Sequence, residues 1–402
     1  MINKFFKLKL ENWRQLKKID IEFDNNVIIL TGPNGSGKTT ILNILNRHFG
    51  WNLNFVSTPF LSETKQKKIW SDFYSIYKNE ADIDFDKNIS IGSIEYTNGT
   101  ICTIFVPKIQ SSNYQLQYQN QQSVIGLHIP SHRPVVVNTP VQHIPTNPKT
   151  SQQHFQDYNN LLIQTYGSQS VQNPSSTLKE SLVALALFGY GNKATQGNPE
   201  YREIFEGFND VLKKILPETI GFYELEIRTP DIVLRTRTGD FSLGAMSGGI
   251  NSLFSLAWQI YMFNYNQGQS IITFDEPENH LHPSMQRELV PSLRKAFPET
   301  IFVISTHSPF VVTSDPDARV YALSYNEERH ILSNKLEGAE LSSSPNKILK
   351  EILDVSSVTP IWVEKRIKEI LETYKGDASK LYEELKKIGL LQFELTNFNS
   401  GD

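Results

Sequence analysis

A glycine-rich segment near the beginning of the chain constrains the fold more than any other feature. It consists of Gly32, Pro33, Asn34, Gly35, Ser36, Gly37, Lys38, Thr39 and Thr40. Its spacing, G-x-x-x-x-G-K-[ST], is typical of a loop that binds phosphate groups. The mostly apolar residues 26–31 before it predict a short buried strand, and the apolar pattern of residues 39–49 predicts a helix. A strand, a glycine loop and a helix in this order predict an α/β protein that binds a nucleoside triphosphate.

The residue types in this segment indicate the chemistry of the site. Glycines let backbone N–H groups surround a phosphate without interference from a Cβ atom, and the helix N-terminus adds partial positive charge. We expect Lys38 to contact the β- and γ-phosphates and the Thr39 hydroxyl to ligate Mg²⁺. The loop alone is compatible with many classes of NTPase.

Length and composition indicate a globular protein with a large core. With 402 residues, 39% hydrophobic and 20% charged, the chain can form one elaborated domain or two. Cys102 is the only cysteine, which excludes an intrachain disulfide and a multi-cysteine metal site and fits a reducing cytosol. The first residues lack the pattern of a signal peptide, and no run of 18 apolar residues predicts a membrane span. We therefore expect a cytoplasmic protein without a membrane partner.

The charge distribution gives little support to nucleic-acid binding. The net charge is −4, so no global basic field attracts nucleic acid. The first 18 residues are an exception, because they contain only Glu11 against Lys4, Lys7, Lys9, Arg14, Lys17 and Lys18. This segment is either a contact for phosphates or a solvated basic edge strand.

Periodicity and turn signals divide the chain into a core, an insertion and a tail within one elaborated domain. We expect the core from residues 1–50 and 240–335, an insertion with hairpins, helices and Gln/Ser/Asn-rich loops over 51–239, and a helical tail over 340–402. Alternating strands and helices after residue 240 predict a parallel core sheet, and the N-terminal strands predict a mixed antiparallel sheet. The predicted strands are 5–10, 19–23, 26–31, 89–96, 100–107, 124–129, 222–228, 232–236, 270–274, 301–305, 319–323 and 330–332, and the predicted helices are 39–49, 61–80, 178–189, 200–215, 248–265 and 284–297. Most of 110–176 is predicted to be surface loops.

A second part of a nucleotide site follows the strand predicted over residues 270–274. Asp275 and Glu276 are adjacent carboxylates at the end of this apolar run, which is the Walker B arrangement. We expect Asp275 to hold Mg²⁺, directly or through water. Glu276 is then placed to polarise the water that attacks the γ-phosphate.

A second anion site is predicted where Ser247, Gly248 and Gly249 begin a helix. The serine offers a hydroxyl, the glycines expose backbone N–H groups, and the helix dipole favours a phosphate. Its position about 28 residues before Asp275 resembles the signature motif of ABC-type ATPases. In that family the signature serves the nucleotide of the opposing subunit. The resemblance therefore implies ATP as the nucleotide and a head-to-tail homodimer with two ATP molecules in its interface.

Residues 276–283, with the sequence EPENHLHP, resemble the segment after Walker B in the RecF/SMC/OLD branch of that family. The resemblance implies a turn at the dimer interface, with His282 and Pro283 starting the next helix. His280 and His282 also have a spacing that can chelate a metal, which is the alternative interpretation. His307, after the next strand, is similar to the switch histidine of the same family, and the resemblance implies that it senses the γ-phosphate.

Two further nucleotide contacts are less specific. Arg133, in a "Ser-x-Arg" pattern after the strand predicted over 124–129, occupies the place of the family's lid residue and is a candidate phosphate contact. Asn12, Trp13 and Arg14 match an "Asn-aromatic-Arg" turn of RecF/SMC-like proteins. Arg14 or Trp13 is a candidate adenine contact, and a plain turn is the alternative. The Asp-Pro-Asp at 315–317 lacks the flanking units of a Toprim nuclease, so we reject that interpretation.

The resemblance covers residues 1–50 and 120–330, and the tail is similar in style to AAA15/AAA21-type ATPases of bacterial defence loci. It implies an ATP-hydrolysing switch or scaffold whose output is carried by a separate effector, a nuclease or a toxin. Anti-phage defence is the implied setting, by analogy with PARIS, Septu and retron-associated ATPases. A RecF-like DNA-repair ATPase is the alternative. A transporter's nucleotide-binding subunit is a third interpretation, which the long gap between Lys38 and Ser247 disfavours.

Overall fold

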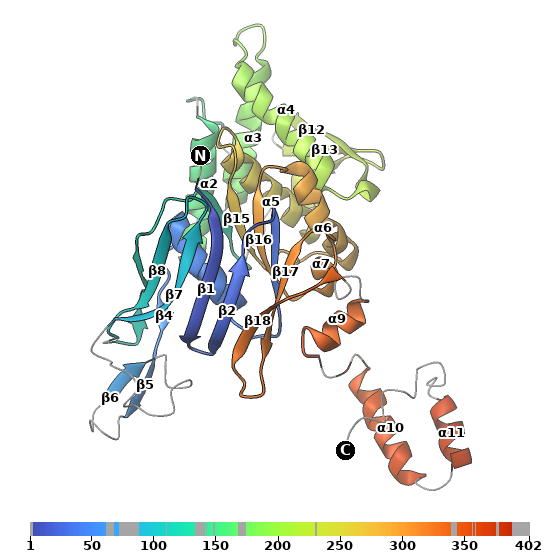
Figure 1. Cartoon of the computed structure of the whole chain (residues 1–402). Coiled ribbons are helices and arrows are strands. Elements are labelled where there is room, and N and C mark those ends of the chain that lie inside the picture. Colours follow the sequence, from blue (N-terminus) through green and yellow to red (C-terminus); the bar gives the residue numbers. More distant parts are fainter. Residues whose placement is uncertain are drawn as a thin grey trace. The chain divides into compact units, whose positions relative to one another are not determined.

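The computed structural model divides the chain into two compact units, residues 1–345 and 346–402 (Figure 1). The residues it describes are 3–61, 68–71, 88–109, 111–132, 141, 143–147, 149–167, 174–229, 231–338, 344–355, 357, 359–374 and 378–387. The candidate nucleotide site lies in the first unit.

An 11-stranded sheet organises the described part of the first unit. Its strands in spatial order are β10 (Gln117–Gln119), β8 (Ile101–Val106), β7 (Ile89–Tyr96), β1 (Phe5–Trp13), β2 (Leu16–Glu22), β18 (Ile331–Lys335), β17 (Arg319–Tyr325), β3 (Val27–Thr31), β16 (Ile301–Thr306), β15 (Ile271–Asp275) and β11 (Gly126–Ile129). Neighbours from β17 to β11 are parallel, and neighbours from β10 to β2 are antiparallel. The predicted α/β class, with an antiparallel N-terminal part and a parallel core, is confirmed.

Parallel pairing determines where functional side chains meet. The carboxyl ends of β3, β15 and β16 lie at one edge of the sheet because these strands run in the same direction. The residues that follow them are the glycine loop, Glu276 and His307. Ligands of open α/β sheets bind at this edge.

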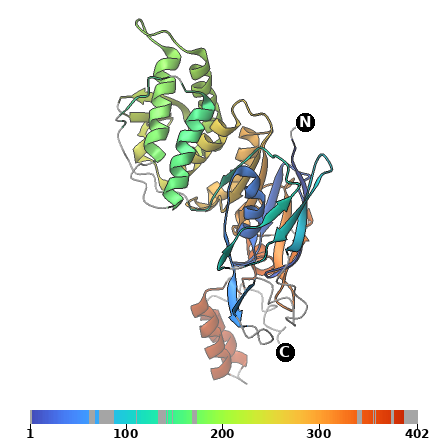
Figure 2. The same ribbon diagram turned by 90° about the vertical axis from the view of Figure 1, so that its left-hand side faces the viewer.

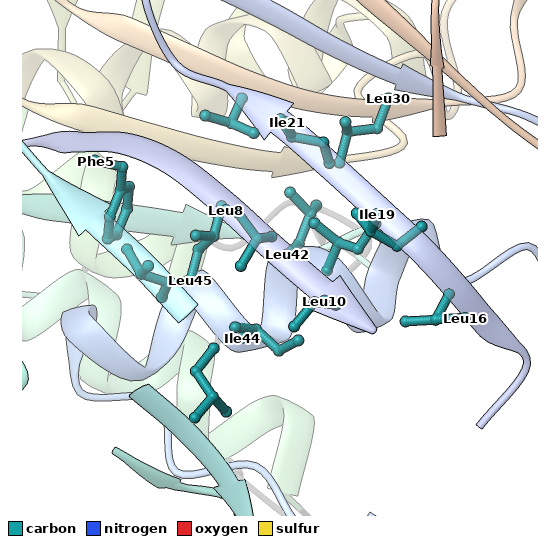
Figure 3. Close-up of a cluster of buried hydrophobic side chains, with 14 of the residues drawn as sticks. Phe5, Leu8, Leu10, Leu16, Ile19, Ile21, Leu30, Leu42, Ile44 and Leu45 are labelled. Atoms are coloured by element: carbon teal, nitrogen blue, oxygen red, sulfur yellow. The ribbon is translucent and has the colours of Figure 1, made fainter. Parts of the chain in front are cut away.

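Helix α1 (Lys38–Asn46) shares a hydrophobic cluster with the antiparallel part of the sheet. Leu8 of β1 and Leu42 and Leu45 of α1 are fully buried in this cluster, which Figure 3 shows. Burying one leucine side chain contributes about 1.5–3 kcal/mol. The helix that begins at the glycine loop is therefore held firmly against the sheet.

A helical lobe follows β11 in the chain, and Figure 2 shows its green helices gathered beside the large sheet. It contains α2 (Ser151–Gly167), α3 (Pro174–Tyr190), α4 (Pro199–Ile215) and α5 (Gly248–Asn264), with a small sheet of β12 (Phe222–Arg228), β13 (Asp231–Thr236) and β14 (Phe241–Ser242). The ring of Phe208 packs edge-on against those of Phe254 and Trp258, at centroid distances of 5.3 and 5.2 Å. Aromatic packing of this kind joins α4 to α5.

Two expectations for the insertion were wrong. Helix α2 lies in a region that was predicted to be mostly loops. The prediction failed because many polar residues mask the helical spacing of Phe155, Tyr158 and Leu162, which are buried. The helix predicted over residues 61–80 is absent where the structure describes that region. There β5 (Thr58–Leu61) and β6 (Lys68–Ser71) pair antiparallel, so cross-strand pairing overrides the local apolar spacing; residues 62–67 and 72–80 lie outside the described residues.

The remaining elements are short or lie toward the end of the chain. They are η1 (Arg47–Phe49), β4 (Phe55–Val56), β9 (Asn113–Tyr114), η3 (Glu218–Ile220), η4 (Leu243–Ala245), α6 (Pro283–Ala296), α7 (Pro309–Val312), α9 (Pro345–Glu351), α10 (Ile361–Thr373) and α11 (Ala378–Lys387). The second unit is helical where it is described. Across all described residues, no helix has the length and apolarity needed to cross a membrane.

Candidate nucleotide-binding site

The loop between β3 and α1 has a backbone conformation that favours glycine. Gly32, Gly35 and Gly37 have φ values of 142°, 80° and 85°. A Cβ atom on Gly32 would lie 2.3 Å from the Leu323 carbonyl oxygen, which is closer than real Cβ contacts allow. The loop closes on itself through a hydrogen bond from the Ser36 N–H to the Pro33 carbonyl, 3.2 Å long. This geometry is typical of a phosphate-binding loop.

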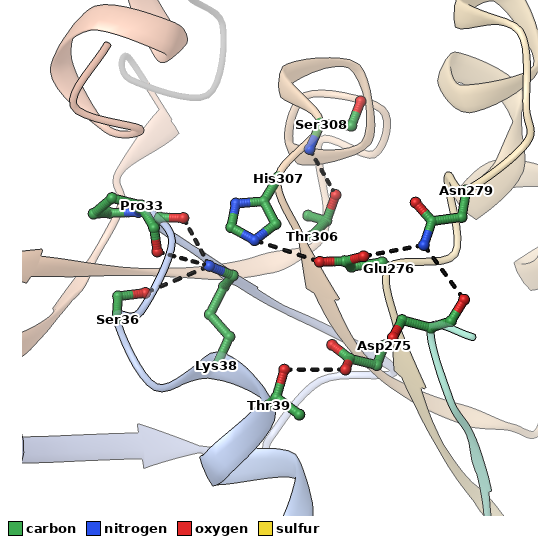
Figure 4. Close-up of polar contacts among 12 residues, drawn as sticks. Pro33, Ser36, Lys38, Thr39, Asp275, Glu276, Asn279, Thr306, His307 and Ser308 are labelled. Carbon is green, nitrogen blue, oxygen red and sulfur yellow. Dashed lines mark hydrogen bonds and ion pairs between the residues drawn. The ribbon is translucent and has the colours of Figure 1, made fainter. Parts of the chain in front are cut away.

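The Lys38 side chain lies against this loop. Its Nζ donates hydrogen bonds to the carbonyl oxygens of Gly32 (2.8 Å) and Pro33 (3.0 Å), and it is 3.5 Å from the Ser36 hydroxyl (Figure 4). Burial lowers the pKa of Lys38 to about 8, although the charges of Asp275 and Glu276 oppose this shift. A phosphate with negative charge would compensate for that desolvation.

Thr39 and Asp275, each predicted to hold Mg²⁺, lie in contact, although 236 positions separate them. The Thr39 hydroxyl donates to Asp275 Oδ2 at 3.0 Å. The other carboxylate oxygen, Oδ1, is buried and has no hydrogen-bond partner among the described residues. Burial also raises the pKa of Asp275. A hydroxyl beside a carboxylate oxygen that lacks a partner is a suitable donor set for Mg²⁺.

Glu276 leaves the strand in an unusual backbone conformation. Its φ is 47°, in the left-handed region that non-glycine residues seldom adopt. Its N–H donates to the Ser305 carbonyl at 2.8 Å, which fixes the turn after β15. Its carboxylate accepts a hydrogen bond from the Asn279 amide at 3.0 Å and lies 3.5 Å from His307 Nε2. Strain at such a position is commonly retained at functional sites.

His307 follows β16 and lies between Glu276 and the glycine loop in Figure 4. Burial lowers its pKa, the nearby Lys38 charge lowers it further, and the Glu276 carboxylate opposes both. The imidazole is therefore neutral at pH 7, with one nitrogen able to donate and the other able to accept a hydrogen bond.

Glu278 is a site residue to which the sequence analysis assigned no role. Its Oε1 accepts hydrogen bonds from the Thr306 hydroxyl (2.6 Å), the His307 N–H (2.9 Å) and the Ser308 N–H (3.2 Å). Burial raises the pKa of this carboxyl. The only signal in the sequence was its place two residues after Glu276. The structure shows that Glu278 fixes the backbone that carries His307.

The residues predicted to form the signature are at the start of α5. Ser247 is the N-cap of α5 and is exposed, and its hydroxyl makes no capping hydrogen bond. Gly248 is exposed, and no atom lies within 4 Å of the position of a Cβ. Gly249 is buried next to the turn that contains His280. In the described structure, no hydrogen bond or ion pair connects Ser247, Gly248 or Gly249 to residues 32–40.

Comparison with known proteins identifies the family. Residues 4–96 and 52–312 match the sequence model of AAA_15, described as an AAA ATPase domain. The chain belongs to this AAA ATPase family. It is 20% identical to the Septu protein PtuA of Bacillus thuringiensis, over 96% of this chain and 93% of PtuA. It is 28% identical to the retron Ec83 probable ATPase of Escherichia coli, over 42% of this chain and 31% of that protein.

A comparison of structures finds the SMC head domain from Thermotoga maritima. The TM-score is 0.44 at 15% sequence identity, and the alignment covers 83% of this chain and 99% of that domain.

The predicted adenine contacts have different surroundings in this AAA ATPase. The Trp13 ring is fully buried, and its Nε1 donates to the Tyr114 hydroxyl at 3.2 Å, so it cannot lie against a nucleotide. The Arg14 guanidinium lies 5.2 Å from the Trp13 ring centroid and 5.1 Å from that of Phe55. Its contact with a nucleotide stays a prediction. Arg133 lies outside the described residues.

His282 and Pro283 start the next helix, as the family resemblance implied, and His280 lies in the turn before it. His282 is the N-cap of α6, its Nδ1 is 2.9 Å from the Ser284 hydroxyl, and Pro283 is the first helical residue. Within the described ranges, no group of three or more His, Cys, Asp or Glu side chains is arranged to hold a metal.

Asp315 and Asp317 are bound to Arg294, at 2.7 and 3.3 Å, and have a structural role.

Proposed function

We propose that this AAA ATPase binds ATP with Mg²⁺ between the glycine loop and β15, and that hydrolysis operates a switch. The observation that supports this most directly is the meeting of Thr39 with Asp275 and of Glu276 with His307 beside Lys38. These groups come from three separate segments of the sequence. They supply a cation for phosphates, a hydroxyl and a carboxylate for Mg²⁺, and a carboxylate and an imidazole for the water and the γ-phosphate.

The residues would divide the reaction among them. Thr39 and Asp275 would hold Mg²⁺, which when bound neutralises charge on the phosphate oxygens. The Lys38 amine would give up its hydrogen bonds to the Gly32 and Pro33 carbonyls and donate to phosphate oxygens instead. Glu276 would orient the attacking water and accept its proton, and His307 would donate a hydrogen bond to the γ-phosphate.

The proposal includes a head-to-tail dimer in which Ser247 of one copy closes over the nucleotide of another. An exposed hydroxyl with no capping bond and the open space at Gly248 support this, because both are accessible to a second molecule. The helix N-terminus at α5 favours an anion there.

The output of the switch is proposed to be a separate effector, a nuclease or a toxin, in anti-phage defence in the bacterial cytoplasm. Similarity to a Septu protein over 96% of the chain supports this setting.

A RecF-like DNA-repair role has less support. Lys7 in the basic N-terminal segment is already paired with Asp20 (2.9 Å) and Glu22 (3.1 Å). Filter binding of duplex DNA with and without ATP separates the two functions, and binding in either state would favour repair.

Three variants test the proposal, with phosphate release, ATP binding and light scattering as measurements. We expect Lys38→Ala to abolish ATP binding. Glu276→Gln should bind ATP, lose turnover and accumulate the dimer. Ser247→Arg should bind ATP as a single chain and fail to pair. Full activity of Ser247→Arg would refute the composite site.

The effector can be sought with the same Glu276→Gln variant. Purified from its native host in the presence of ATP, it should retain a second polypeptide that mass spectrometry identifies. Lys38→Ala is the matched control, because it should lose that polypeptide if nucleotide occupancy controls the association.

A further inference from the structure

An ion pair between a buried lysine and a partly exposed aspartate connects helix α3 of the helical lobe to β13, the strand that precedes the signature. Lys179 of α3 is 1% exposed, and its Nζ lies 3.0 Å from Asp231 Oδ1 at the start of β13. A lysine is almost never buried to this extent unless it is paired. The pair is therefore a specific attachment of α3 to β13 within the lobe.

The second oxygen of the same carboxylate extends this contact to the signature. Asp231 Oδ2 accepts a hydrogen bond from the Ser242 hydroxyl. The Ser242 hydroxyl oxygen in turn accepts from the Gly244 N–H at 3.3 Å, as the N-cap of η4. Four residues, 243–246, then separate Ser242 from Ser247.

Residues 243–246, which form this short connection, are restrained at both ends. Leu243 is buried and begins η4, and the Met246 carbonyl accepts from the Asn251 side chain in α5 at 3.5 Å. Both ends of the segment 243–246 are thus bonded, one to Asp231 and the other to the helix that Ser247 starts. Hydrogen bonds through Ser242 thus connect the segment before Ser247 to the Lys179–Asp231 pair.

We propose that Lys179, Asp231 and Ser242 are positioning residues for the signature, which they hold in the geometry that receives the second copy's nucleotide. This inference rests on the proposed ATP-dependent dimer. It also makes α3 a route by which a ligand or partner on the helical lobe can change pairing without touching Lys38 or Thr39.

The test uses the full chain with Glu276→Gln, so that ATP is bound and not consumed. Ser242→Ala removes only the hydroxyl that joins the ion pair to η4. We expect ATP-dependent pairing to weaken about tenfold, because pairing must then supply the ordering of the signature that one hydrogen bond to a charged group provides in the parent. ATP affinity at protein concentrations too low for pairing should stay within about twofold, because Lys38 and Thr39 are unchanged. Ser242→Thr, which keeps a hydroxyl, should restore pairing.

A second variant removes the ion pair without leaving a buried charge. Lys179→Met with Asp231→Leu should weaken pairing as Ser242→Ala does, while the circular dichroism spectrum stays that of the parent. Lys213→Met is the matched control, because it breaks the exposed 2.8 Å pair with Asp210 on α4 and should leave pairing unchanged.

The outcomes separate the inference from the proposed function. If the Glu276→Gln parent does not pair with ATP, the proposed dimer is wrong and the inference fails with it. If the parent pairs and folded Ser242→Ala pairs equally tightly, only the inference is wrong. A fall in single-chain ATP affinity that matches the loss of pairing would also overturn it.

Discussion

The ionisation of Lys38 leads to a quantitative prediction for ATP affinity. Burial lowers the pKa of this lysine to about 8 in the free protein. The protonated amine is the form that binds phosphate, and the charge of a bound triphosphate would keep it protonated. Binding is then close to full strength at pH 7 and weakens as the pH rises through 8. With a pKa of about 8, we expect an ATP dissociation constant about tenfold higher at pH 9 than at pH 7.

The measurement is binding of a non-hydrolysable ATP analogue to the wild-type chain at saturating Mg²⁺, by titration calorimetry from pH 7 to pH 9, because Glu276→Gln would itself remove a charge that raises the pKa of Lys38. Lys38→Arg is the control, because a guanidinium stays charged over this range and its affinity should not depend on pH. A dissociation constant for the Lys38 protein that changes less than twofold would refute the reasoning. An equal pH dependence in Lys38→Arg would assign the effect to another group.

The same pKa shift predicts the opposite trend for the stability of the free protein. The ordinary pKa of lysine is 10.5, so between about pH 8 and 10.5 the unfolded chain binds more protons at this site than the folded chain. The contribution of Lys38 to the free energy of unfolding should therefore rise with pH in this window. Urea unfolding of the wild type and Lys38→Ala at pH 8 and pH 10 gives this contribution by difference.

Three further substitutions test parts of the site and its support. Glu278→Ala removes the acceptor of three hydrogen bonds. It should lower kcat at least tenfold and the free energy of unfolding by about 2–4 kcal/mol, measured by phosphate release and urea titration. Arg294→Met leaves the Asp315 carboxylate, which is 3% exposed, without its partner; we expect a loss of about 1–2 kcal/mol in urea and unchanged ATP affinity. Gly32→Ala places a Cβ 2.3 Å from a carbonyl oxygen and should weaken ATP binding in calorimetry, whereas Gly50→Ala, with positive φ but open space, should bind normally.

The sequence predicted the parts of this site that depend on strand ends. The Thr39 and Asp275 contact follows from parallel pairing of β3, β16 and β15, because residues after parallel strands share one edge. Motifs with fixed spacing from those ends therefore located Lys38 and Glu276 as well. These predictions required only local strand patterns and the family's order of motifs.

The missed features depend on contacts that local sequence does not reveal. Glu278 acts on residues 28–30 positions later, and no spacing rule specifies which buried N–H groups a carboxylate will accept from. The burial of Trp13 depends on the distant Tyr114 and Phe55. Helix α2 was missed because its sequence is polar and has no charge pattern typical of a helix. Its packing on α5 and α3 stabilises it instead.

Contacts within one chain connect the predicted signature to the Glu276 carboxylate of that same chain. A Cβ on Gly249 would lie 3.1 Å from the His280 carbonyl oxygen, so the start of α5 packs tightly on the turn after Walker B. Asn279 in this turn donates to the Glu276 carboxylate at 3.0 Å, and Glu278 holds the His307 backbone at 2.9 Å. In the proposed dimer, each signature contacts the nucleotide of the other copy and touches the turn that orients Glu276 in its own copy. Occupancy of one site would therefore be communicated to the catalytic groups of the other over a few packed residues, which makes cooperative hydrolysis the expected behaviour.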